Sequence, residues 1–178
     1  MMTSAMYAKI EEKMFEKFKT LKKQIEEKMK VTLTLESGGI VRIETEDPYM
    51  AMKVKQVIEA ISMGYDKLDI LQMMDADLVL QTIDVKELVG SGNKLKRTLG
   101  RLIGTKGKVK EAIEHLTETK IKINEEEGTV GILGRPENTD IARIALLKII
   151  RGKPQNKVIQ ELERKRIDIK MRKLGIWM

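Results

Sequence analysis

The segment Gly104-Thr105-Lys106-Gly107 has the residue types and spacing best suited to binding an anion. Glycine has no Cβ and adopts positive φ angles without strain, so two glycines three residues apart allow a tight turn that a ligand can approach closely. Lys106 lies inside the turn, and Arg101 and Lys108 flank it. A helix that begins after the turn would add free N–H groups. Phosphate is the anion that this combination fits.

Two glycines with this spacing can also simply end a helix at a corner between two helices. The segments around the loop decide between these two interpretations. Apolar residues at helical spacing follow Gly107, and an alternating polar and apolar segment follows that helix. Pro136 is placed as the first-turn proline of a last helix. The predicted order is a strand at 78–85, a helix near Leu95, the G-x-x-G loop, a helix at 108–119, a strand at 120–124, a turn at 125–128, a strand at 129–133 and a helix from 136 to about 151.

The first half of the sequence repeats this pattern at a separation of 88 residues. The correspondences are Ile25 with Ile113, Leu33 and Leu35 with Ile121 and Ile123, Pro48 with Pro136, and Gly64 with Gly152. The same shift places the residues Glu16, Lys17, Phe18 and Lys19 opposite the four loop residues, and neither glycine is present. We therefore expect a first unit with the same scaffold but without the loop, and with its opening strand within residues 1–8.

Positive charge is concentrated in the half that contains the loop. Residues 1–88 hold 13 Lys and Arg against 16 Asp and Glu, a net charge of −3, whereas residues 89–178 hold 21 against 11, a net charge of +10. An asymmetry of this size predicts a polyanionic partner for the second half, most simply nucleic acid. The chain has one Trp, three Tyr and two Phe, and none lies in the loop segment. An RRM or OB surface, which stacks bases on aromatic side chains, is therefore a poor fit.

The loop segment resembles the KH domain of the β-α-α-β-β-α type. The resemblance rests on Ile103 before the first glycine, on the spacing to Ile113, and on a Thr-x-x-x-Ile-x-Ile sequence that ends at Ile123. KH domains need no aromatic platform, because the G-x-x-G backbone clamps about four nucleotides. The resemblance implies an α+β fold of two tandem KH domains, each a three-stranded sheet packed on helices, and a C-terminal helix. The expected parts are 1–65 without G-x-x-G, 66–77 as a linker helix, 78–152 with an intact G-x-x-G, and 153–178 as a basic C-terminal helix.

This resemblance also implies which residues contact RNA. Gly104 and Gly107 would let the backbone approach phosphates, and Thr105 and Lys106 would face solvent and RNA. Ile103 would begin an apolar floor, to which Ile121 or Ile123 contributes from the opposite strand. Electrostatic attraction to the phosphates, which salt weakens, would come from Arg97, Arg101, Lys108 and Lys122. Lys110 stands where many KH domains carry an aliphatic residue, so we expect another phosphate or base-edge contact there.

Across residues 21–178 the sequence is similar to the archaeal members of the ribosomal RNA-processing KH family, whose eukaryotic relatives are the partner-of-Nob proteins. The similarity includes the segments DPYMAMKVKQVIEAISMG and GRLIGTKGKVKEAIEHLT and the basic LERKR sequence. It implies binding of single-stranded RNA near the 3′ end of small-subunit rRNA during ribosome biogenesis. It also implies cooperation with the endonuclease that trims this end, and contacts with the dimethyladenosine transferase or an initiation-factor subunit. Two alternatives are an adaptor for another RNA and a protein-interaction scaffold that acts through the acidic first half.

Catalysis finds no support in the sequence. His115 is the only histidine, and we expect it on a helix surface near Glu111 and Glu118. We expect neither an enzyme nor a cofactor or metal site. The chain has no cysteine and no apolar run long enough for a membrane span. These features, with an N-terminus unlike a signal peptide, predict a cytoplasmic protein without a membrane partner. The C-terminal helix is expected either to pack with a solvated outer face or to contact RNA.

Overall fold

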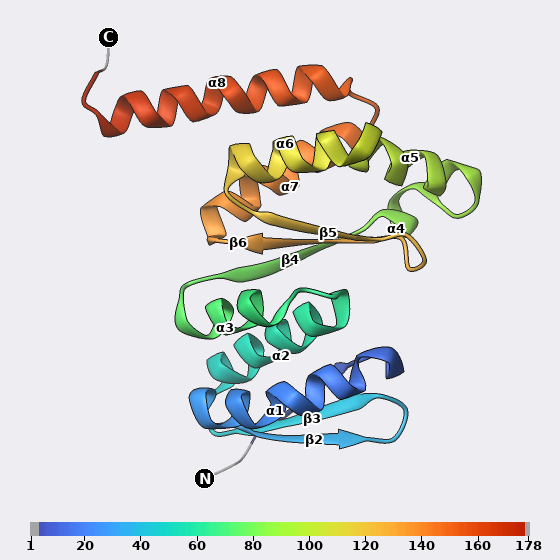
Figure 1. Ribbon diagram of the computed structural model, residues 1–178, viewed down its shortest axis with the longest axis vertical. Helices are drawn as coiled ribbons and strands as arrows, with labels where there is room; N and C mark the ends of the chain where they lie inside the picture. The colour runs from blue at the N-terminus through green and yellow to red at the C-terminus, as the bar shows by residue number, and fades with distance from the viewer. Residues whose placement is uncertain (1–3, 177–178) are drawn as a thin grey trace. The chain divides into compact units, whose positions relative to one another are not determined.

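The computed structural model describes residues 4–176, which form two compact units with their boundary between Leu80 and Gln81 (Figure 1). Each unit contains one three-stranded sheet and several helices, which confirms the α+β fold class. The strand order is β1-β3-β2 in the first unit and β4-β6-β5 in the second. In both sheets the last strand of the unit therefore lies in the centre.

The first unit packs its helices on one face of its sheet. Its elements are β1 (Ser4–Lys9), η1 (Glu12–Met14), α1 (Phe15–Met29), β2 (Thr32–Glu36), β3 (Ile40–Thr45), α2 (Pro48–Met63) and α3 (Lys67–Asp75). Along β3, Val41 and Ile43 are fully buried, whereas Ile40 is exposed. This alternation is typical of a strand with one face on the core and one in solvent. The predicted opening strand is present from Ser4, and residues 1–3 lie outside the described part.

Among the described residues, the second unit has two more α-helices than the first, and each unit has one 3-10 turn. Its elements are β4 (Val79–Asp84), α4 (Val85–Val89), α5 (Asn93–Ile103), η2 (Thr105–Gly107), α6 (Lys108–Thr117), β5 (Lys120–Asn124), β6 (Thr129–Gly134), α7 (Pro136–Ile150) and α8 (Gln155–Lys173). Buried residues from β4, β5 and β6 form one core with residues from α5, α6, α7 and α8. The predicted helix over 108–119 ends two residues early because Glu118 takes a left-handed conformation.

The 88-residue repeat extends to individual backbone conformations. Lys30 and Glu118 follow α1 and α6 in the left-handed region, with φ angles of 52° and 54°. In each unit the N–H of the next residue donates to the carbonyl oxygen five positions back, at 3.3 Å in the first unit and 3.1 Å in the second. Both units therefore end this helix with the same turn.

The repeat also includes the helix that follows each unit's last long helix. Helix α3 begins at Lys67 and α8 at Gln155, which are again 88 residues apart. Ile70 of α3 and Val158 of α8 occupy equivalent positions, and both are buried. The segment expected to be a linker helix is thus the counterpart of the first half of the C-terminal helix.

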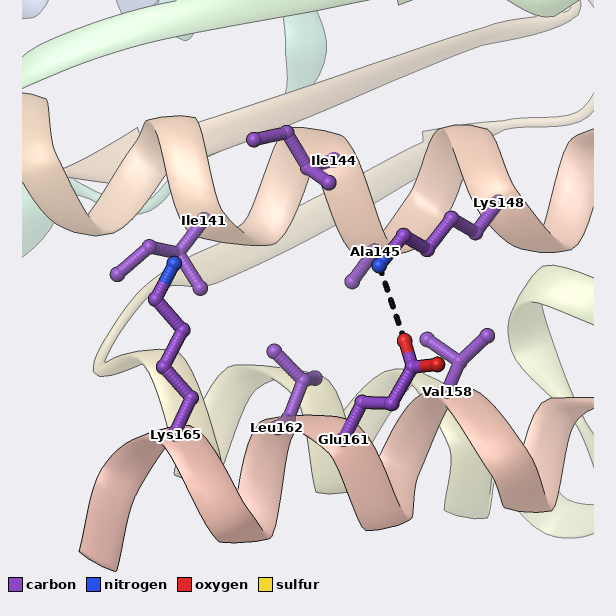
Figure 2. Close-up of a pocket in the computed structure, with 8 residues that line it drawn as sticks. All are labelled: Ile141, Ile144, Ala145, Lys148, Val158, Glu161, Leu162 and Lys165. Carbon is purple, nitrogen blue, oxygen red and sulfur yellow. Dashed lines mark hydrogen bonds and ion pairs between the residues drawn. The ribbon is translucent and has the colours of Figure 1, made fainter. Parts of the chain in front are cut away.

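Helix α8 packs on α7 through its first half. Val158 and Leu162 are buried, and they line a small cavity of about 60 Å³ beside Ala145 of α7 (Figure 2). Glu161 accepts a hydrogen bond of 2.9 Å from Lys148 and another from Lys153. These two ammonium groups lower the pKa of Glu161 to about 2. The first half of α8 is therefore part of the second unit's fold, while residues 163–173 are exposed.

The two units differ most in the segment between their first strand and the equivalent helices α1 and α6. Strands β1 and β4 are separated by 75 residues, whereas β2 and β5 are separated by 88. The second unit is therefore 13 residues longer in this segment, which forms α4, α5 and η2. In the first unit the corresponding chain runs into one continuous helix, α1, which contains Glu16 and Lys19. This agrees with the predicted lack of a G-x-x-G loop.

Candidate nucleic-acid interface

The G-x-x-G loop joins α5 to α6 through three residues with positive φ angles. Gly104 ends α5 with φ 76° and ψ 175°, Lys106 has φ 53° and ψ 30°, and Gly107 has φ 74° and ψ 11°. The Gly104 N–H donates to the Gly100 carbonyl at 2.9 Å, and the Gly107 N–H donates to the Gly104 carbonyl at 3.2 Å. The chain therefore turns sharply between the two helices without an intervening flexible segment.

Glycine is required at position 104 for two separate reasons. Its φ and ψ angles lie in a region that residues with a Cβ rarely adopt. A Cβ at this position would also lie 2.8 Å from the backbone nitrogen of Val109 and 2.4 Å from the Val109 Cγ2 atom. Gly107 needs glycine less strictly, because a Cβ there would approach only the Glu111 side chain, at 3.8 Å.

The outer surface of the loop presents cationic and polar groups to solvent. Thr105, Lys106 and Lys108 are exposed. Gly107 occupies the N-cap position of α6 and has no side chain with which to cap the helix. The first turn of α6 therefore offers backbone N–H groups beside two lysine ammonium groups, an arrangement suited to phosphate.

Helix α6 and strand β5 lie next to each other after the loop, joined by hydrogen bonds. Ile103 and Ile123 are half-buried, so each keeps an apolar edge that a base could contact. Ile121 is 1% exposed and belongs to the core. Of the two isoleucines predicted on this strand, Ile123 is therefore the one available to a ligand.

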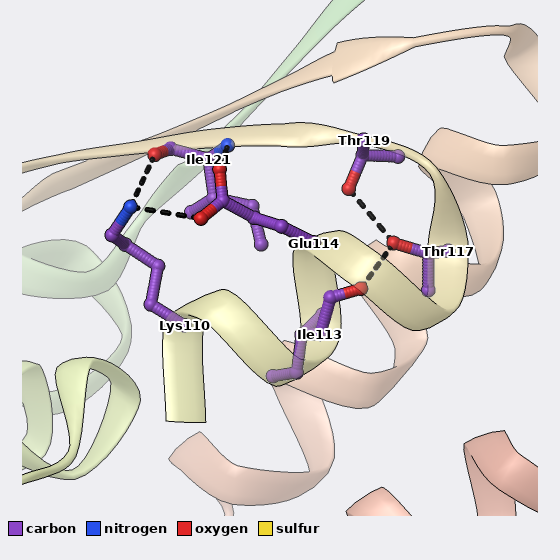
Figure 3. A network of polar contacts seen from close by, with 6 residues as sticks. All are labelled: Lys110, Ile113, Glu114, Thr117, Thr119 and Ile121. Atoms are coloured by element: carbon purple, nitrogen blue, oxygen red, sulfur yellow. Dashed lines mark hydrogen bonds and ion pairs between the residues drawn. The ribbon is translucent and has the colours of Figure 1, made fainter. Parts of the chain in front are cut away.

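Lys110 joins α6 to β5 instead of projecting freely into solvent. Its Nζ donates to Glu114 Oε1 at 2.9 Å and to the Ile121 carbonyl at 3.5 Å (Figure 3). Glu114 Oε2 in turn accepts the backbone N–H of Ile121 at 2.9 Å. The Lys110–Glu114 pair thus fixes the separation of helix and strand. Lys110, for which a phosphate or base-edge contact is predicted, therefore has partners inside the protein.

The first unit contains the same contact without the loop. Glu26 Oε1 accepts the backbone N–H of Leu33 at 2.9 Å, and Lys22 lies 3.9 Å from the same oxygen. These residues are 88 positions before Lys110, Glu114 and Ile121. The helix-to-strand contact therefore belongs to the shared scaffold.

Arg101 has a structural role that its position beside the loop does not predict. Its guanidinium donates to the carbonyls of Ile149 and Lys153 at 2.9 and 3.0 Å, where α7 ends. In the first unit, the carbonyl of Tyr65, 88 residues before Lys153, accepts a hydrogen bond from Lys17. Arg101 therefore anchors α5 to the end of α7, and fewer of its N–H groups remain for phosphate.

The remaining predicted cations lie on different surfaces. Arg97 is exposed on α5. Lys122 is also exposed, but strand alternation places it on the opposite face of the sheet from Ile121 and Ile123. The structure therefore places Ile103 directly before the loop and links Lys110 to β5 at Ile121, whereas Lys122 lies on the other face of the sheet.

Two residues near the loop were not predicted from the sequence. Glu114 could not be predicted, because its partner, the Ile121 N–H, is defined only by the packing of α6 on β5. Gly100 lies one turn before the loop on an exposed part of α5, and nothing lies within 4 Å of the Cβ it lacks. A small residue one turn before G-x-x-G is a signal that the sequence did contain.

Groups suited to other chemistry are scattered. Within residues 4–176, no three His, Cys, Asp or Glu side chains are placed to hold a metal ion together. Asp75 pairs with Lys28, and the His115 side chain is exposed on α6. The described helices include none with the length and apolar character needed to cross a membrane.

Comparison with known proteins identifies the family. Residues 79–167 match the family model for the second domain of PNO1 proteins, described as a eukaryotic type KH domain, or KH-domain type I. The KH domain-containing protein MJ0443 of Methanocaldococcus jannaschii is 32% identical over 161 residues, which cover 88% of this chain and 70% of that protein. The chain belongs to the PNO1-type KH-domain family. The residues that match the PNO1 model include the G-x-x-G loop, α6 and β5.

A further relative and two solved structures are similar to this chain. The RNA-binding protein pno1 of Ixodes scapularis is 36% identical over 117 residues, and this chain spans about half of its length, 49%. A crystal structure of a protein of unknown function from Aeropyrum pernix has a TM-score of 0.87 and 29% identity, and covers 99% of this chain and 98% of its own. The structure of Dim2p of Pyrococcus horikoshii in a complex with a/eIF2alpha and rRNA has a TM-score of 0.80 and 28% identity. The match covers 93% of this chain and 96% of the Dim2p chain.

Proposed function

We propose that this protein binds single-stranded RNA in a groove along α6 and β5, with the G-x-x-G loop as the phosphate clamp. One observation carries the proposal: Gly104 and Gly107 hold an uncapped helix N-terminus and two exposed lysines in one surface, within a KH domain of type I. KH domains use this loop to clamp the backbone of about four nucleotides. The bases would then lie along Ile103, Lys110 and Ile123.

We further propose that the RNA is the 3′ region of small-subunit rRNA during ribosome biogenesis. The support is the similarity to the Pyrococcus horikoshii Dim2p chain, whose structure includes rRNA and a/eIF2alpha. The concentration of positive charge in the second half of the chain favours the same class of ligand. An initiation-factor subunit is accordingly a proposed protein partner. The endonuclease that trims the rRNA and the dimethyladenosine transferase remain predicted partners from the family resemblance.

We also propose that the first unit is a KH domain that has lost its loop and serves the scaffold or a protein partner. Its strand order, its left-handed helix end and its Lys22–Glu26 contact match those of the second unit. Residues 1–80 hold 12 Lys and Arg against 14 Asp and Glu, a net charge of −2. A surface of this charge is better suited to a protein than to RNA.

The test is a titration of short RNAs against wild type and a Thr105→Asp/Lys106→Asp variant. Both side chains are exposed, and aspartate tolerates the left-handed conformation of position 106. The variant therefore adds two carboxylates to the loop without the clash expected at Gly104. The control, Lys23→Glu/Gln24→Glu, makes the same change in charge on the exposed surface of α1.

We expect wild type to prefer the small-subunit rRNA 3′ end over a scrambled RNA of the same composition. The loop variant should lose about tenfold or more in affinity, while the control keeps it. Equal binding of both RNAs would favour an adaptor for another RNA. Equal affinity of the loop variant and the control would contradict the loop as the clamp. Salt-independent binding of a protein by residues 1–80, without RNA affinity, would favour the scaffold.

A further inference from the structure

A basic hollow, separate from the G-x-x-G loop, lies between α4, α5 and the end of α7. Its volume is about 700 Å³. The residues that line it are Leu88, Val89, Lys94, Arg97, Thr98, Arg101, Leu147, Ile150, Arg151 and Gly152. Neither Lys106 nor Gly107 is among them, so the hollow is separate from the phosphate-binding surface of the loop.

The charges that line the hollow are all of one sign. Four of its ten lining residues are Lys or Arg, and none is Asp or Glu. Lys94, Arg97 and Arg151 are exposed, and within the described part of the chain their side chains take part in no ion pair or hydrogen bond. Lysines elsewhere in this unit, such as Lys110 and Lys148, are paired with glutamates. The three free cations therefore make the hollow a site for a polyanion.

Arg101 gives the hollow a fixed wall. Its two hydrogen bonds to the carbonyls of Ile149 and Lys153 hold α5 against the end of α7. Gln155 adds a third link, because its Nε2 donates to the Arg101 carbonyl at 2.8 Å. The hollow is thus preformed between anchored helices, which reduces the ordering that a ligand would have to impose.

The hollow also has an apolar part. Leu88 is 57% exposed, and Val89, Leu147 and Ile150 are half-buried. Free cations beside an exposed aliphatic surface match a nucleotide, which has an anionic phosphate and an apolar base face. An acidic peptide would satisfy the cations but would leave this aliphatic surface uncovered. The hollow therefore suits RNA better than an acidic peptide.

Helix α5 connects the hollow to the G-x-x-G loop. Arg97 lies on the hollow, and Gly104 follows it by seven residues on the same helix, which is about 10 Å of helix length. A strand whose phosphates are held at the loop could therefore continue along α5 into the hollow. The four nucleotides of a KH clamp would not by themselves fill both places.

We propose that this hollow is a second RNA subsite, which takes a nucleotide and its phosphates from the strand that leaves the G-x-x-G groove. The proposal rests on the proposed RNA-binding function. It assigns Lys94, Arg97 and Arg151 to phosphate contacts and the Leu88 surface to a base or ribose. Binding of RNA would then depend on strand length beyond four nucleotides.

The experiment compares RNAs of four and about ten nucleotides on wild type and an Arg97→Gln/Arg151→Gln variant. The control is Arg135→Gln/Lys157→Gln, which removes two exposed positive charges of the same unit outside the hollow. We expect the hollow variant to bind the longer RNA about tenfold more weakly, and to lower the slope of log affinity against log salt by about 1.4. Its affinity for the four-nucleotide RNA should equal that of the control.

The outcomes separate this subsite from the loop. An equal loss for both RNA lengths would overturn the subsite, because the two arginines would then act within the groove. A loss for the longer RNA that is no larger than the control's would also overturn it. If the Thr105→Asp/Lys106→Asp variant keeps full affinity while the hollow variant loses it, the loop clamp fails and the hollow stands as the RNA site.

Discussion

The two units share a scaffold and differ in one segment. Both have the strand order first-third-second, the left-handed end of the repeated helix and a glutamate that accepts a strand N–H. Only the second has α5 and the G-x-x-G loop within the described residues. The comparison separates residues that hold the fold from those available for a ligand. Glu114 has a counterpart in Glu26, and the Lys153 carbonyl that Arg101 contacts has one in the Tyr65 carbonyl, whereas the first unit has no glycine loop.

The largest expected effect on stability comes from substitution of Gly104, for which the first unit has no equivalent glycine. Gly104→Ala should lower the free energy of unfolding of the second unit by about 3 kcal/mol or more, because of both its dihedral angles and the contact with the Val109 backbone. Gly107→Ala should cost only about 1 kcal/mol, since its position is open. Hydrogen exchange of the slowest amides in each unit measures both changes. Equal costs for the two glycines would contradict the geometry of the loop.

Removal of the shared glutamate should have a similar effect in each unit. Glu114→Ala leaves the Ile121 N–H without its acceptor, and Glu26→Ala does the same to Leu33. Each change should cost about 1–3 kcal/mol in its own unit. The same hydrogen-exchange measurement applies. A loss in the second unit alone would show that this contact is specific to the groove and not part of the shared scaffold.

The anchor at the end of α7 should show a smaller effect. Arg101→Met keeps the aliphatic length but removes the hydrogen bonds to the Ile149 and Lys153 carbonyls. We expect a loss of about 1–2 kcal/mol in the second unit. Lys17→Met, which removes the bond to the Tyr65 carbonyl, is the matched change in the first unit. Unchanged stability of Arg101→Met would return this arginine to the set of free phosphate contacts.

The smallest effect concerns the ion pairs that Glu161 makes in the first half of α8. The pKa of Glu161 is lowered from 4.5 to about 2 by Lys153 and Lys148, so its contribution to stability is present above pH 4.5. That contribution is lost as the pH falls from 4.5 towards 2, because the carboxylate is then protonated. Glu161→Gln should therefore lower Tm at pH 7, and the two curves of Tm against pH should meet near pH 2. Parallel curves of Tm against pH across this range would exclude the ion pairs of Glu161 as the cause of the difference in Tm.

The sequence predicted the features that depend on local patterns. The two glycines, the alternation at 120–124 and the repeat of Pro48 and Pro136 were enough for the loop, the strands and the two units. Helix α4 was not predicted, because its five residues are followed by a Gly and Ser segment that indicates a turn.

The role of individual side chains was harder to predict. The partners of Arg101 are backbone carbonyls 48 and 52 residues away, and those of Lys110 depend on how α6 packs on β5. Ile121 and Ile123 lie on one face of the same strand, so alternation could not say which is buried. These assignments require tertiary structure, since charge and spacing alone favour a ligand wherever a cation lies near the loop.

The most direct test of the central claim is an NMR titration of the full chain with a four-nucleotide single-stranded RNA from the small-subunit rRNA 3′ end. If the second unit alone carries the clamp, the backbone amides of Gly104 to Lys108 shift on binding. The amides of Glu16 to Lys19, at the equivalent positions of the first unit, keep their positions. Shifts at residues 16–19 with an unmoved loop would contradict this account.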